Sequence, residues 1–534
     1  MSAANDPGQA DPDRDILRTQ IDRRLAWAMT GSFLAVIFSV PVVQVAIEFA
    51  QGRSVQAVEL FTRVPTRENL HRYEKDLERA SAARGAVRPY LQLGLSQYPR
   101  FGNSNVILGR DGWLFYRPGV EFLTGRGLLD EARLRLRRKE LSGAGEAAPS
   151  PDPRPAILAF HEACRDAGVH LVVVPVPDKS VLQPGELTGR LGRAEQSEAP
   201  VNPDYARLLA DLRGAGVDVY DPTPARLAPG ESPRFLRQDT HWTPDWMESV
   251  AHDLAAHIRG RVPLTPERTY QVHETPVRRV GDLVDMLELP SGQRLFPPQE
   301  VVVRRVLDGR TGGPWKSNPD ADIVLLGDSF SNIYTASEMG WGEAAGLPAQ
   351  LSRFLGREVD AIALNGSGAS GTRRELAHRP APLTGKRVVV WQFAARDLVV
   401  GNWEVVPLPP SPAGGKPVAP PESDTPIVIE GTVVATSRVP APYSVPYKDC
   451  LTYTKLRVDR VAEGRYADDQ IIAVLWGLKD NVLQPAAGYA PGKRLRLRLV
   501  PLRYAPPELQ SVRRVDDLDD FEHRPYLALE EQEQ

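Results

Sequence analysis

Cysteine is nearly absent from this chain, which has only Cys164 and Cys450 among its 534 residues. The two lie far apart and belong to no cysteine pair at metal-ligand spacing, so the sequence predicts no metal site. We do not expect a disulfide between them, because it would have to join two different domains. So low a count suits either redox compartment and leaves the location of the protein to other signals.

The chain also lacks an excess of charge of either sign. Its 65 lysines and arginines nearly balance 68 aspartates and glutamates, for a formal net charge of -3. A basic excess marks many nucleic-acid-binding proteins, so we expect no nucleic-acid partner. Neither a G-x-G-x-x-G fingerprint nor a P-loop lysine occurs in a suitable context, and we predict no cofactor.

One long apolar run is present near the N-terminus. Residues 25–47 contain no charged side chain, and a helix of about 20 apolar residues spans a bilayer. The alternative is a cleaved signal peptide, whose apolar core is usually about 7–15 residues and is followed by a small-residue cleavage site. Glu48 and Phe49 follow the run instead, so we predict an uncleaved transmembrane anchor.

Arginines divide almost evenly about this run, with Arg14, Arg18, Arg23 and Arg24 before it and Arg53, Arg63 and Arg67 after it. This bias barely favours a cytoplasmic N-terminus, but a long C-terminal part can cross the membrane whatever its charge. We therefore predict a cytoplasmic stub over residues 1–24, a single pass through the inner membrane, and the bulk of the chain in the periplasm.

A chain of this length exceeds what one hydrophobic core usually organises, so we expect several folded units. Residues 48–100 are typical of a membrane-proximal helical segment. Residues 101–404 are predicted to form an α/β domain that begins with a hairpin over residues 103–115. Residues 405–426 have the proline-rich composition of a linker, and residues 427–534 are predicted to form a β-rich domain with an acidic tail.

Short apolar runs alternate with helical patterns in the α/β domain. The predicted strands are 169–176, 217–221, 322–327, 359–365 and 387–393, and the predicted helices include 156–167, 204–215 and 243–258. This alternation favours a parallel sheet with helices on both faces. In the last domain Leu495, Leu497 and Leu499 alternate with arginines, which indicates one buried face. We predict a small antiparallel β-sandwich or barrel over residues 427–505 and a solvated acidic tail.

Ser329 lies in the segment Gly-Asp-Ser-Phe-Ser, directly after a predicted buried strand and before a predicted helix. A serine on such a sharp turn stands at the carboxyl edge of the sheet, where nearby N–H groups can stabilise an oxyanion. Its hydroxyl is a weak nucleophile until a base takes the proton. Taken alone, the segment is more often an ordinary turn that ends a strand.

Asp239 and His241 lie two residues apart in Asp-Thr-His-Trp-Thr-Pro. Residues two apart in an extended segment point the same way, so the carboxylate can orient His241 and stabilise its imidazolium. Thr243 and Pro244 are typical of a helix N-cap and a first helical position, which would hold the segment rigidly. An isolated pair of this kind is more often a capped turn beside an incidental histidine.

The two segments gain weight from their shared position, because ligands bind at the carboxyl ends of the strands in open α/β sheets. Lys179, Asn365, Gly368 and Arg396 also follow predicted strands and are candidates for contact with an oxyanion or substrate. Gly368 is the preferred oxyanion donor, although a strand-to-helix turn explains this glycine equally well. Lys179 could bind an anionic substrate, but a salt bridge with Asp178 is the stronger expectation.

The order of these motifs resembles that of the alginate O-acetyltransferase family, the AlgJ- and AlgX-type proteins with an SGNH hydrolase-like domain. The resemblance covers roughly residues 100–400 and rests on DTHWTP before GDSFS, with GRDGWLFY upstream. It implies Ser329 as the nucleophile, His241 as the general base and Asp239 as its orienting partner. The Gly-x-Asn segment of ordinary SGNH hydrolases is absent, so one oxyanion donor stays unassigned.

The resemblance further implies transfer of an acetyl group through Ser329 to hydroxyls of an exopolysaccharide acceptor. Acetyl-coenzyme A is not expected outside the cytoplasm, so a membrane-bound O-acyltransferase would supply the acetyl group. Two alternatives stay open. One is a carbohydrate esterase that uses the same triad with water, and the other is a non-catalytic polysaccharide-binding or assembly scaffold.

Overall fold

A computed structural model describes residues 22–50, 66, 70, 82–144, 149–190, 199–224, 232–409, 425–442 and 447–533. The chain divides into two compact units, residues 1–91 and residues 92–534. Most of the predicted stub, much of the predicted membrane-proximal segment and most of the predicted linker lie outside the described residues.

Helix α2, Arg23–Ala50, makes up most of the described part of the first unit. The predicted apolar run falls within this one continuous helix. Among the described residues it is the one helix whose length and composition suffice to cross a membrane. A second helix, α5 (Ala82–Gln97), contains Pro89 and continues into the second unit.

A five-stranded parallel sheet lies at the centre of the second unit, in the strand order β4-β3-β9-β7-β8. The strands are β3 (His170–Val176), β4 (Asp218–Val219), β7 (Ile323–Gly327), β8 (Asp360–Ala363) and β9 (Val388–Ala394). Strands β7 and β9 are buried at every residue, as expected of a parallel sheet that is covered on both faces. All five strands coincide with predicted runs, although β4 is reduced to two residues.

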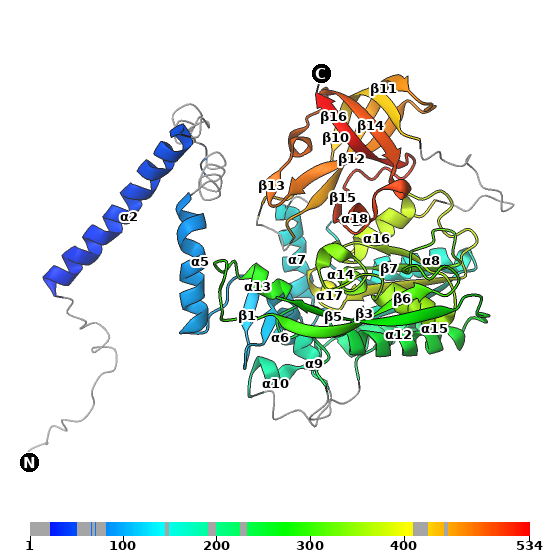
Figure 1. The fold of residues 1–534 in the computed structure, drawn as a ribbon, viewed down its shortest axis with the longest axis horizontal. Helices are drawn as coiled ribbons and strands as arrows, with labels where there is room; N and C mark the ends of the chain where they lie inside the picture. Colours follow the sequence, from blue (N-terminus) through cyan, green and yellow to red (C-terminus); the bar gives the residue numbers. More distant parts are fainter. Residues whose placement is uncertain are drawn as a thin grey trace, which may run out of the picture. The chain divides into compact units, whose positions relative to one another are not determined.

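Helices cover both faces of this sheet. The main ones are α8 (Arg154–Asp166), α11 (Tyr205–Gly214), α12 (Pro244–Arg259), α15 (Leu347–Leu355) and α16 (Gly368–Ala377). In Figure 1, α16 lies above the sheet and α12 and α15 lie below it. The predicted helices correspond to α8, α11 and α12. Helices and strands share one apolar core, which includes Trp242, Trp391 and Trp403.

Further elements complete the α/β domain. They are β1 (Val106–Leu108), β2 (Leu114–Tyr116), α6 (Arg117–Thr124), α7 (Glu131–Ala144), α9 (Lys179–Leu182), α10 (Pro184–Leu187), α13 (Asp282–Met286), α14 (Ser329–Asn332), η2 (Ser337–Met339) and α17 (Asp397–Val400). Strands β1 and β2 form the predicted antiparallel hairpin. A second hairpin, β5 (Tyr270–Arg279) with β6 (Gln299–Asp308), was not predicted. Strand β5 is largely exposed, whereas β6 buries Val303 and Val306 in the core, and the hairpin interrupts the helix–strand alternation on which the sequence prediction depended.

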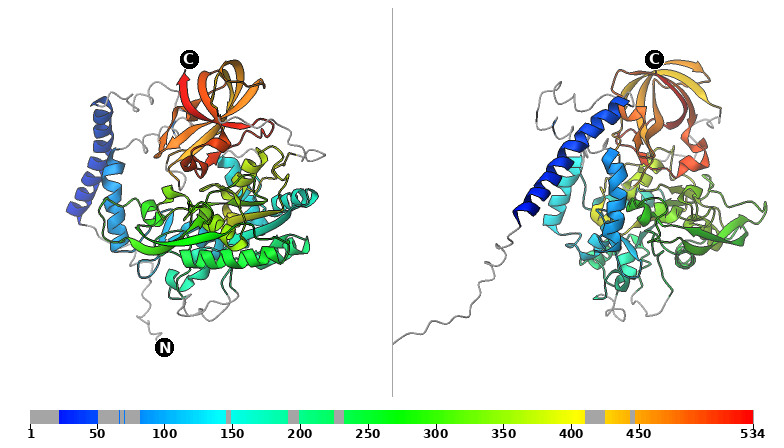
Figure 2. Two further views of the ribbon diagram at one scale, coloured as in Figure 1. Left: turned by 45° about the vertical axis from the view of Figure 1, so that its right-hand side comes forward. Right: turned by 60° about the vertical axis from the view of Figure 1, so that its left-hand side comes forward.

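The C-terminal domain is a closed β-barrel, visible in both views of Figure 2. Its strands are β10 (Ile427–Thr436), β11 (Cys450–Glu463), β12 (Gln470–Lys479), β14 (Arg494–Pro501) and β16 (Pro525–Glu533). They pair in the ring β10-β11-β12-β16-β14-β10, and β12–β16 is the parallel pair. A five-stranded barrel with this connectivity is an OB-fold. Leu495, Leu497 and Leu499 lie in the barrel core, as the alternation predicted.

Short elements decorate the barrel: β13 (Val482–Leu483), η3 (Pro485–Gly488), η4 (Leu502–Tyr504), α18 (Pro507–Gln510) and β15 (Arg514–Val515). The prediction of a solvated acidic tail holds only in part, because Asp517, Asp519 and Glu522 are exposed whereas Asp516 and Asp520 are not. Its last residues form β16, a strand of the barrel, and the side chains of Asp516 and Asp520 are each 7% exposed. Their basic partners, Arg374 and Lys455, are distant in sequence, so local composition could not reveal the burial.

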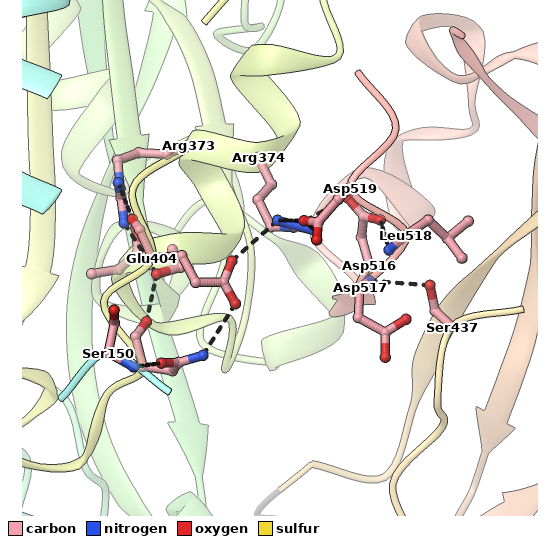
Figure 3. A network of polar contacts seen from close by, with 12 residues as sticks. Ser150, Arg373, Arg374, Glu404, Ser437, Asp516, Asp517, Leu518 and Asp519 are labelled. Carbon is pink, nitrogen blue, oxygen red and sulfur yellow. Dashed lines mark hydrogen bonds and ion pairs between the residues drawn. The ribbon is translucent and has the colours of Figure 1, made fainter. Parts of the chain in front are cut away.

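Ion pairs join the barrel to the α/β domain (Figure 3). Arg374 of α16 lies 3.3 Å from Asp516 and 2.8 Å from Asp519, both of which belong to the connection between β14 and β16. The same guanidinium lies 3.1 Å from Glu404, which follows α17. His378, one turn after Arg374, lies 2.9 Å from Asp516. The opposite charges of the two domains therefore neutralise one another where they meet.

Candidate active site

Ser329 stands at the carboxyl end of the fully buried strand β7, as the first residue of α14. Its neighbour Asp328 is the N-cap of this short helix and accepts a hydrogen bond from the Phe330 N–H at 2.8 Å. Ser329 is partly exposed, whereas Asp328 and Phe330 are buried. The turn therefore presents the serine hydroxyl at the edge of the sheet on a rigid support.

Gln392 of β9 fixes this turn from the neighbouring strand. Its side-chain oxygen accepts hydrogen bonds from the Asp328 N–H at 3.2 Å and from Ser331 Oγ at 2.6 Å. Its side-chain nitrogen donates to Asp328 Oδ1 at 2.9 Å, and the Ala394 N–H donates to Asp328 Oδ2 at 2.9 Å. Asp328 is therefore fully committed to structure, and its carboxylate holds the serine turn against β9.

His241 lies between the serine and a carboxylate. Its Nε2 is 2.8 Å from Ser329 Oγ, and its Nδ1 is 2.6 Å from Asp239 Oδ1. The His241 and Asp239 side chains are only 4% and 2% exposed. The carboxylate can only accept a hydrogen bond, so Nδ1 carries the proton and Nε2 faces the serine as the basic nitrogen.

The predicted cap next to this segment is present. Thr243 is the N-cap of α12, where its side chain accepts a hydrogen bond from the Trp246 N–H, and Pro244 is the first helical residue. Trp242 ties the histidine segment to the serine turn, because its indole N–H donates to the Phe330 carbonyl oxygen at 3.0 Å. The two motifs are thus held together by backbone as well as by side chains.

Two further groups bind the second oxygen of Asp239. The Trp341 indole N–H donates to Asp239 Oδ2 at 2.9 Å, and the Asp282 N–H donates to it at 3.0 Å. Burial by itself would raise the pKa of Asp239, but the hydrogen bonds from His241, Asp282 and Trp341 hold that pKa below its usual range. Burial disfavours the charged form of His241, and Asp239 outweighs it, so the pKa of His241 is raised.

Asp239, His241 and Asp282 form a cluster in which one ring nitrogen or carboxylate oxygen of each residue lies within 4.8 Å of the others. Most of the ring and carboxylate atoms of these three residues already form hydrogen bonds. The proton on His241 Nδ1 lies between it and Asp239 Oδ1, Asp239 Oδ2 accepts two N–H groups, and Asp282 Oδ1 accepts the Thr240 N–H at 2.7 Å. The cluster is therefore a hydrogen-bonded charge network that is built around the histidine.

The structure does not place Lys179 in the predicted salt bridge with Asp178. The Lys179 ammonium group instead donates to the carbonyl oxygens of Leu114 at 2.8 Å and Arg237 at 3.4 Å. Burial lowers the pKa of Lys179 to about 7, against the attraction of nearby carboxylates. Asp178 pairs with Arg396 at 2.9 Å, a partner that is far away in sequence.

Arg396 lies at the end of β9 and packs over two aromatic rings. Its guanidinium is 5.2 Å from the ring centre of Tyr116 and 5.4 Å from that of Phe330, the residue after Ser329. The next residue, Asp397, has a pKa that burial raises to about 7 while Arg396 opposes the shift. Arg396 therefore places a held cation beside the residue that follows Ser329.

Asn365 lies in the loop after β8, and Gly368 lies where that loop enters α16. The Asn332 side chain of α14 donates to Asn365 Oδ1 at 2.9 Å, so this loop contacts the serine turn. Gly368 is the first residue of α16 and has φ +58, a conformation that favours glycine. N–H groups in the first turn of a helix have no partner within that helix. The position of Gly368 is thus compatible with the predicted donor role.

Sequence patterns missed Trp341, Asp282 and Gln392. The three belong to a loop, the helix α13 and the strand β9, and none forms a motif with Ser329 or His241. The only signal was chemical: a buried aspartate needs donors for both oxygens, and the sequence offers no local ones beyond His241.

Comparison with known proteins places residues 106–395 in a family described as SGNH hydrolase-like domain, acetyltransferase AlgX. The probable alginate O-acetylase AlgJ of Pseudomonas aeruginosa is 31% identical over 317 residues, which is 56% of this chain and 72% of that protein. The Pseudomonas fluorescens protein of the same name is 27% identical over 320 residues, 56% of this chain and 70% of its own length.

Two solved structures are also similar. The O-acetyltransferase domain of Pseudomonas putida AlgJ covers 56% of this chain and 93% of its own, with 23% identity and a TM-score of 0.41. Pseudomonas aeruginosa AlgX covers 80% of this chain and 92% of its own, with 14% identity and a TM-score of 0.40. Because the family model matches more than half of the sequence, the chain belongs to the AlgX-type family of SGNH hydrolase-like acetyltransferase domains.

Proposed function

We propose that this protein is a membrane-anchored O-acetyltransferase that carries the acetyl group on Ser329. The observation that supports this most directly is the continuous chain of contacts from Ser329 Oγ to His241 Nε2 at 2.8 Å and from His241 Nδ1 to Asp239 Oδ1 at 2.6 Å. A serine within reach of a histidine that a carboxylate orients has the geometry of an activated nucleophile.

The reaction has two steps. Ser329 Oγ attacks the carbonyl carbon of an acetyl donor while His241 takes the hydroxyl proton, and the leaving group departs with that proton. An acceptor hydroxyl then gives its proton to His241 and attacks the carbonyl carbon of the acetyl-serine. The bond from that carbon to Ser329 Oγ breaks, and His241 returns the proton to Ser329 Oγ. Asp239 stabilises the imidazolium in both steps. The N–H groups of Ser329 and Gly368, each in the first turn of a helix, are the proposed oxyanion donors.

The proposed acceptor is a hydroxyl of an exopolysaccharide of the alginate type, after the names of the relatives. Helix α2 would anchor the chain in the inner membrane by a single pass, with the active site in the periplasm. A membrane-bound O-acyltransferase would deliver the acetyl group across the membrane to Ser329.

Replacement of the nucleophile tests this proposal. Ser329→Ala should abolish acetylation of the polymer in cells and the transfer of acetyl from a surrogate ester such as 4-nitrophenyl acetate. Ser337→Ala, which changes an exposed serine eight residues later, is the control and should match the unaltered protein. Normal polymer acetylation by Ser329→Ala would refute the mechanism and favour a non-catalytic scaffold.

The same triad would serve a carbohydrate esterase if water reached the acetyl-serine first. The two activities differ in their product, so the assay should follow acetate release and acetyl gain on an added oligosaccharide together. Transfer to the oligosaccharide in excess of hydrolysis supports the transferase. Acetate release alone, at every oligosaccharide concentration, would assign the esterase instead.

A further inference from the structure

Asp282 forms a reciprocal clamp with the segment that carries the histidine. Its N–H donates to Asp239 Oδ2 at 3.0 Å, and its own Oδ1 accepts the Thr240 N–H at 2.7 Å. Each partner therefore supplies one donor and one acceptor. Such a pair fixes both the position and the rotation of the Asp239 carboxylate.

The approach of the two segments is closer than most residues would allow. A Cβ atom at Gly281 would lie 2.2 Å from the Gln238 carbonyl oxygen, so this position has room only for glycine. The Leu283 N–H adds a hydrogen bond to the same Gln238 oxygen at 3.2 Å. Asp282 is thus held against the histidine segment by its neighbours on both sides, and its contact with that segment is built into the backbone.

The Asp282 carboxylate also faces the histidine ring. Its Oδ2 lies 3.8 Å from His241 Nδ1, while Asp239 Oδ1 lies 2.6 Å from the same nitrogen. The Asp282 side chain is 31% exposed, so solvent reaches this second carboxylate and not the first. The other charged groups near the network are two cations, Lys179 on α9 and Arg396 just after β9, and the carboxyl group of Asp285, three residues after Asp282 on α13.

We propose that Asp282 is a positioning residue for acyl transfer, a second carboxylate that orients the Asp239–His241 pair and stabilises the imidazolium formed in each step. This inference rests on the proposed function of Ser329 and His241. A negative charge 3.8 Å from the ring favours the protonated histidine, as Asp239 does at closer range. The clamp lets the charge act without competing for the Nδ1 proton, which stays directed at Asp239.

The electrostatics of the cluster agree with this role. Burial and the neighbouring Asp239 carboxylate raise the pKa of Asp282 to about 6, while the His241 ring opposes that shift. Two carboxylates side by side repel each other. Protonation of the histidine offsets this repulsion, so the arrangement stabilises the imidazolium that forms during transfer.

Two substitutions separate charge from clamp. Asp282→Asn keeps an oxygen that can accept the Thr240 N–H but removes the charge, whereas Asp282→Ala removes both. The full chain in detergent is assayed with 4-nitrophenyl acetate, and kcat/KM is followed against pH. The control is Asp245→Asn, which removes an exposed carboxylate four residues after His241.

Loss of the charge lowers the pKa of His241, so the acid limb of kcat/KM should move to lower pH in both Asp282 variants. We expect kcat to fall about tenfold in Asp282→Asn, which loses the charge, and further in Asp282→Ala, which also loses the hydrogen bond from the Thr240 N–H. Asp245→Asn should leave the acid limb and kcat unchanged.

An acid limb of Asp282→Asn that coincides with that of the unaltered protein would overturn the inference, whatever the loss of rate. This outcome is distinct from failure of the proposed function, in which Ser329→Ala itself would stay active. Thermal unfolding of each variant shows whether a rate loss reflects misfolding, and Asp282→Asn keeps the test decisive if Asp282→Ala does not fold.

Discussion

The described part of the chain contains two buried histidine–aspartate pairs, one beside Ser329 and one between the two domains. His241 lies 2.6 Å from Asp239, and His378 lies 2.9 Å from Asp516. All four side chains are at most 7% exposed. By distance and burial alone, the two pairs are nearly alike.

Their surroundings differ. The ring of His378 stacks on the Tyr453 ring at 5.3 Å, and Arg374 neutralises the Asp516 carboxylate at 3.3 Å. The free nitrogen of His241 instead faces a partly exposed hydroxyl, and its aspartate has a second carboxylate nearby in place of an ion-paired arginine. We expect a buried pair to be reactive when a hydroxyl faces the second ring nitrogen of its histidine. Among the described residues, no such group faces the second ring nitrogen of His378.

The largest expected effect separates the two pairs by rate. Asp239→Asn should lower kcat by about 10⁴-fold, because an amide leaves the histidine in the wrong tautomer. Asp516→Asn makes the same chemical change in the other pair and should leave kcat of the folded protein unchanged. Steady-state assays with a surrogate ester measure both. Equal losses in the two variants would show that the pairs are not functionally distinct.

The next effect separates them by stability. Arg374→Met removes the cation that neutralises Asp516 and should lower the free energy of unfolding by about 3–5 kcal/mol, because it leaves a buried carboxylate without its counterion. Arg135→Met is the control, since Arg135 pairs with Glu131 at 3.2 Å in an exposed position and such pairs contribute about 0–1 kcal/mol. Urea denaturation measures both. Similar midpoints would contradict the structural role of the interdomain pair.

A smaller effect tests the hydrogen bond that holds the Asp239 carboxylate beside His241. Trp341→Phe removes one hydrogen bond to the Asp239 carboxylate, so kcat/KM should fall roughly tenfold to a hundredfold. Trp315→Phe is matched to it: this indole N–H donates to Ser352 Oγ at 2.8 Å, a neutral hydroxyl. The control should lose stability and keep its rate. A rate loss in Trp315→Phe alone would reverse the assignment.

The smallest effect concerns pH. The pKa of Asp516 is lowered, because hydrogen bonding to His378 and the charge of Arg374 outweigh the penalty of burial. A carboxyl group with a depressed pKa in the folded state adds stability above its unfolded pKa of about 3.9, and this is lost as pH falls through the folded value. When the pH is lowered from about 5 to below the folded pKa of Asp516, the unfolding temperature should therefore drop less in Asp516→Asn than in the unaltered protein. Parallel curves would contradict this.

Local spacing, together with the shared position after predicted strands and the family-like order of the motifs, predicted the three residues that meet at the carboxyl edge of the sheet. Ser329 follows an uninterrupted apolar strand, and Asp239 and His241 stand two apart before a capped helix, so short-range rules place them. The parallel sheet followed from the alternation of strands and helices in the same way. Their catalytic roles stay predictions until the variants are measured.

What the sequence could not predict depends on contacts between distant segments. The partner of Asp178 is Arg396 and not its neighbour Lys179. The Lys179 ammonium group instead donates to the backbone carbonyl oxygens of Leu114 and Arg237, which are distant in sequence. Asp282 Oδ2 comes within 3.8 Å of His241 Nδ1 because the glycine at position 281 lets its turn pack closely against Gln238. The acidic tail was expected to be solvated because its composition is polar, yet Asp516 is buried against α16.

OB-fold barrels commonly bind ligands on the face of their second and third strands and with the adjoining loops. Here that face is covered by the chain itself: residues of β11 and β12 pack with Val500, Leu502 and Ala505, and the Tyr453 hydroxyl donates to Glu375 of α16 at 2.9 Å. The barrel therefore cannot be separated from the rest of the chain without uncovering this face. A designer who cut at the proline-rich linker would expose an apolar surface on one fragment and unpaired arginines on the other, so truncations and domain exchanges should keep both parts together.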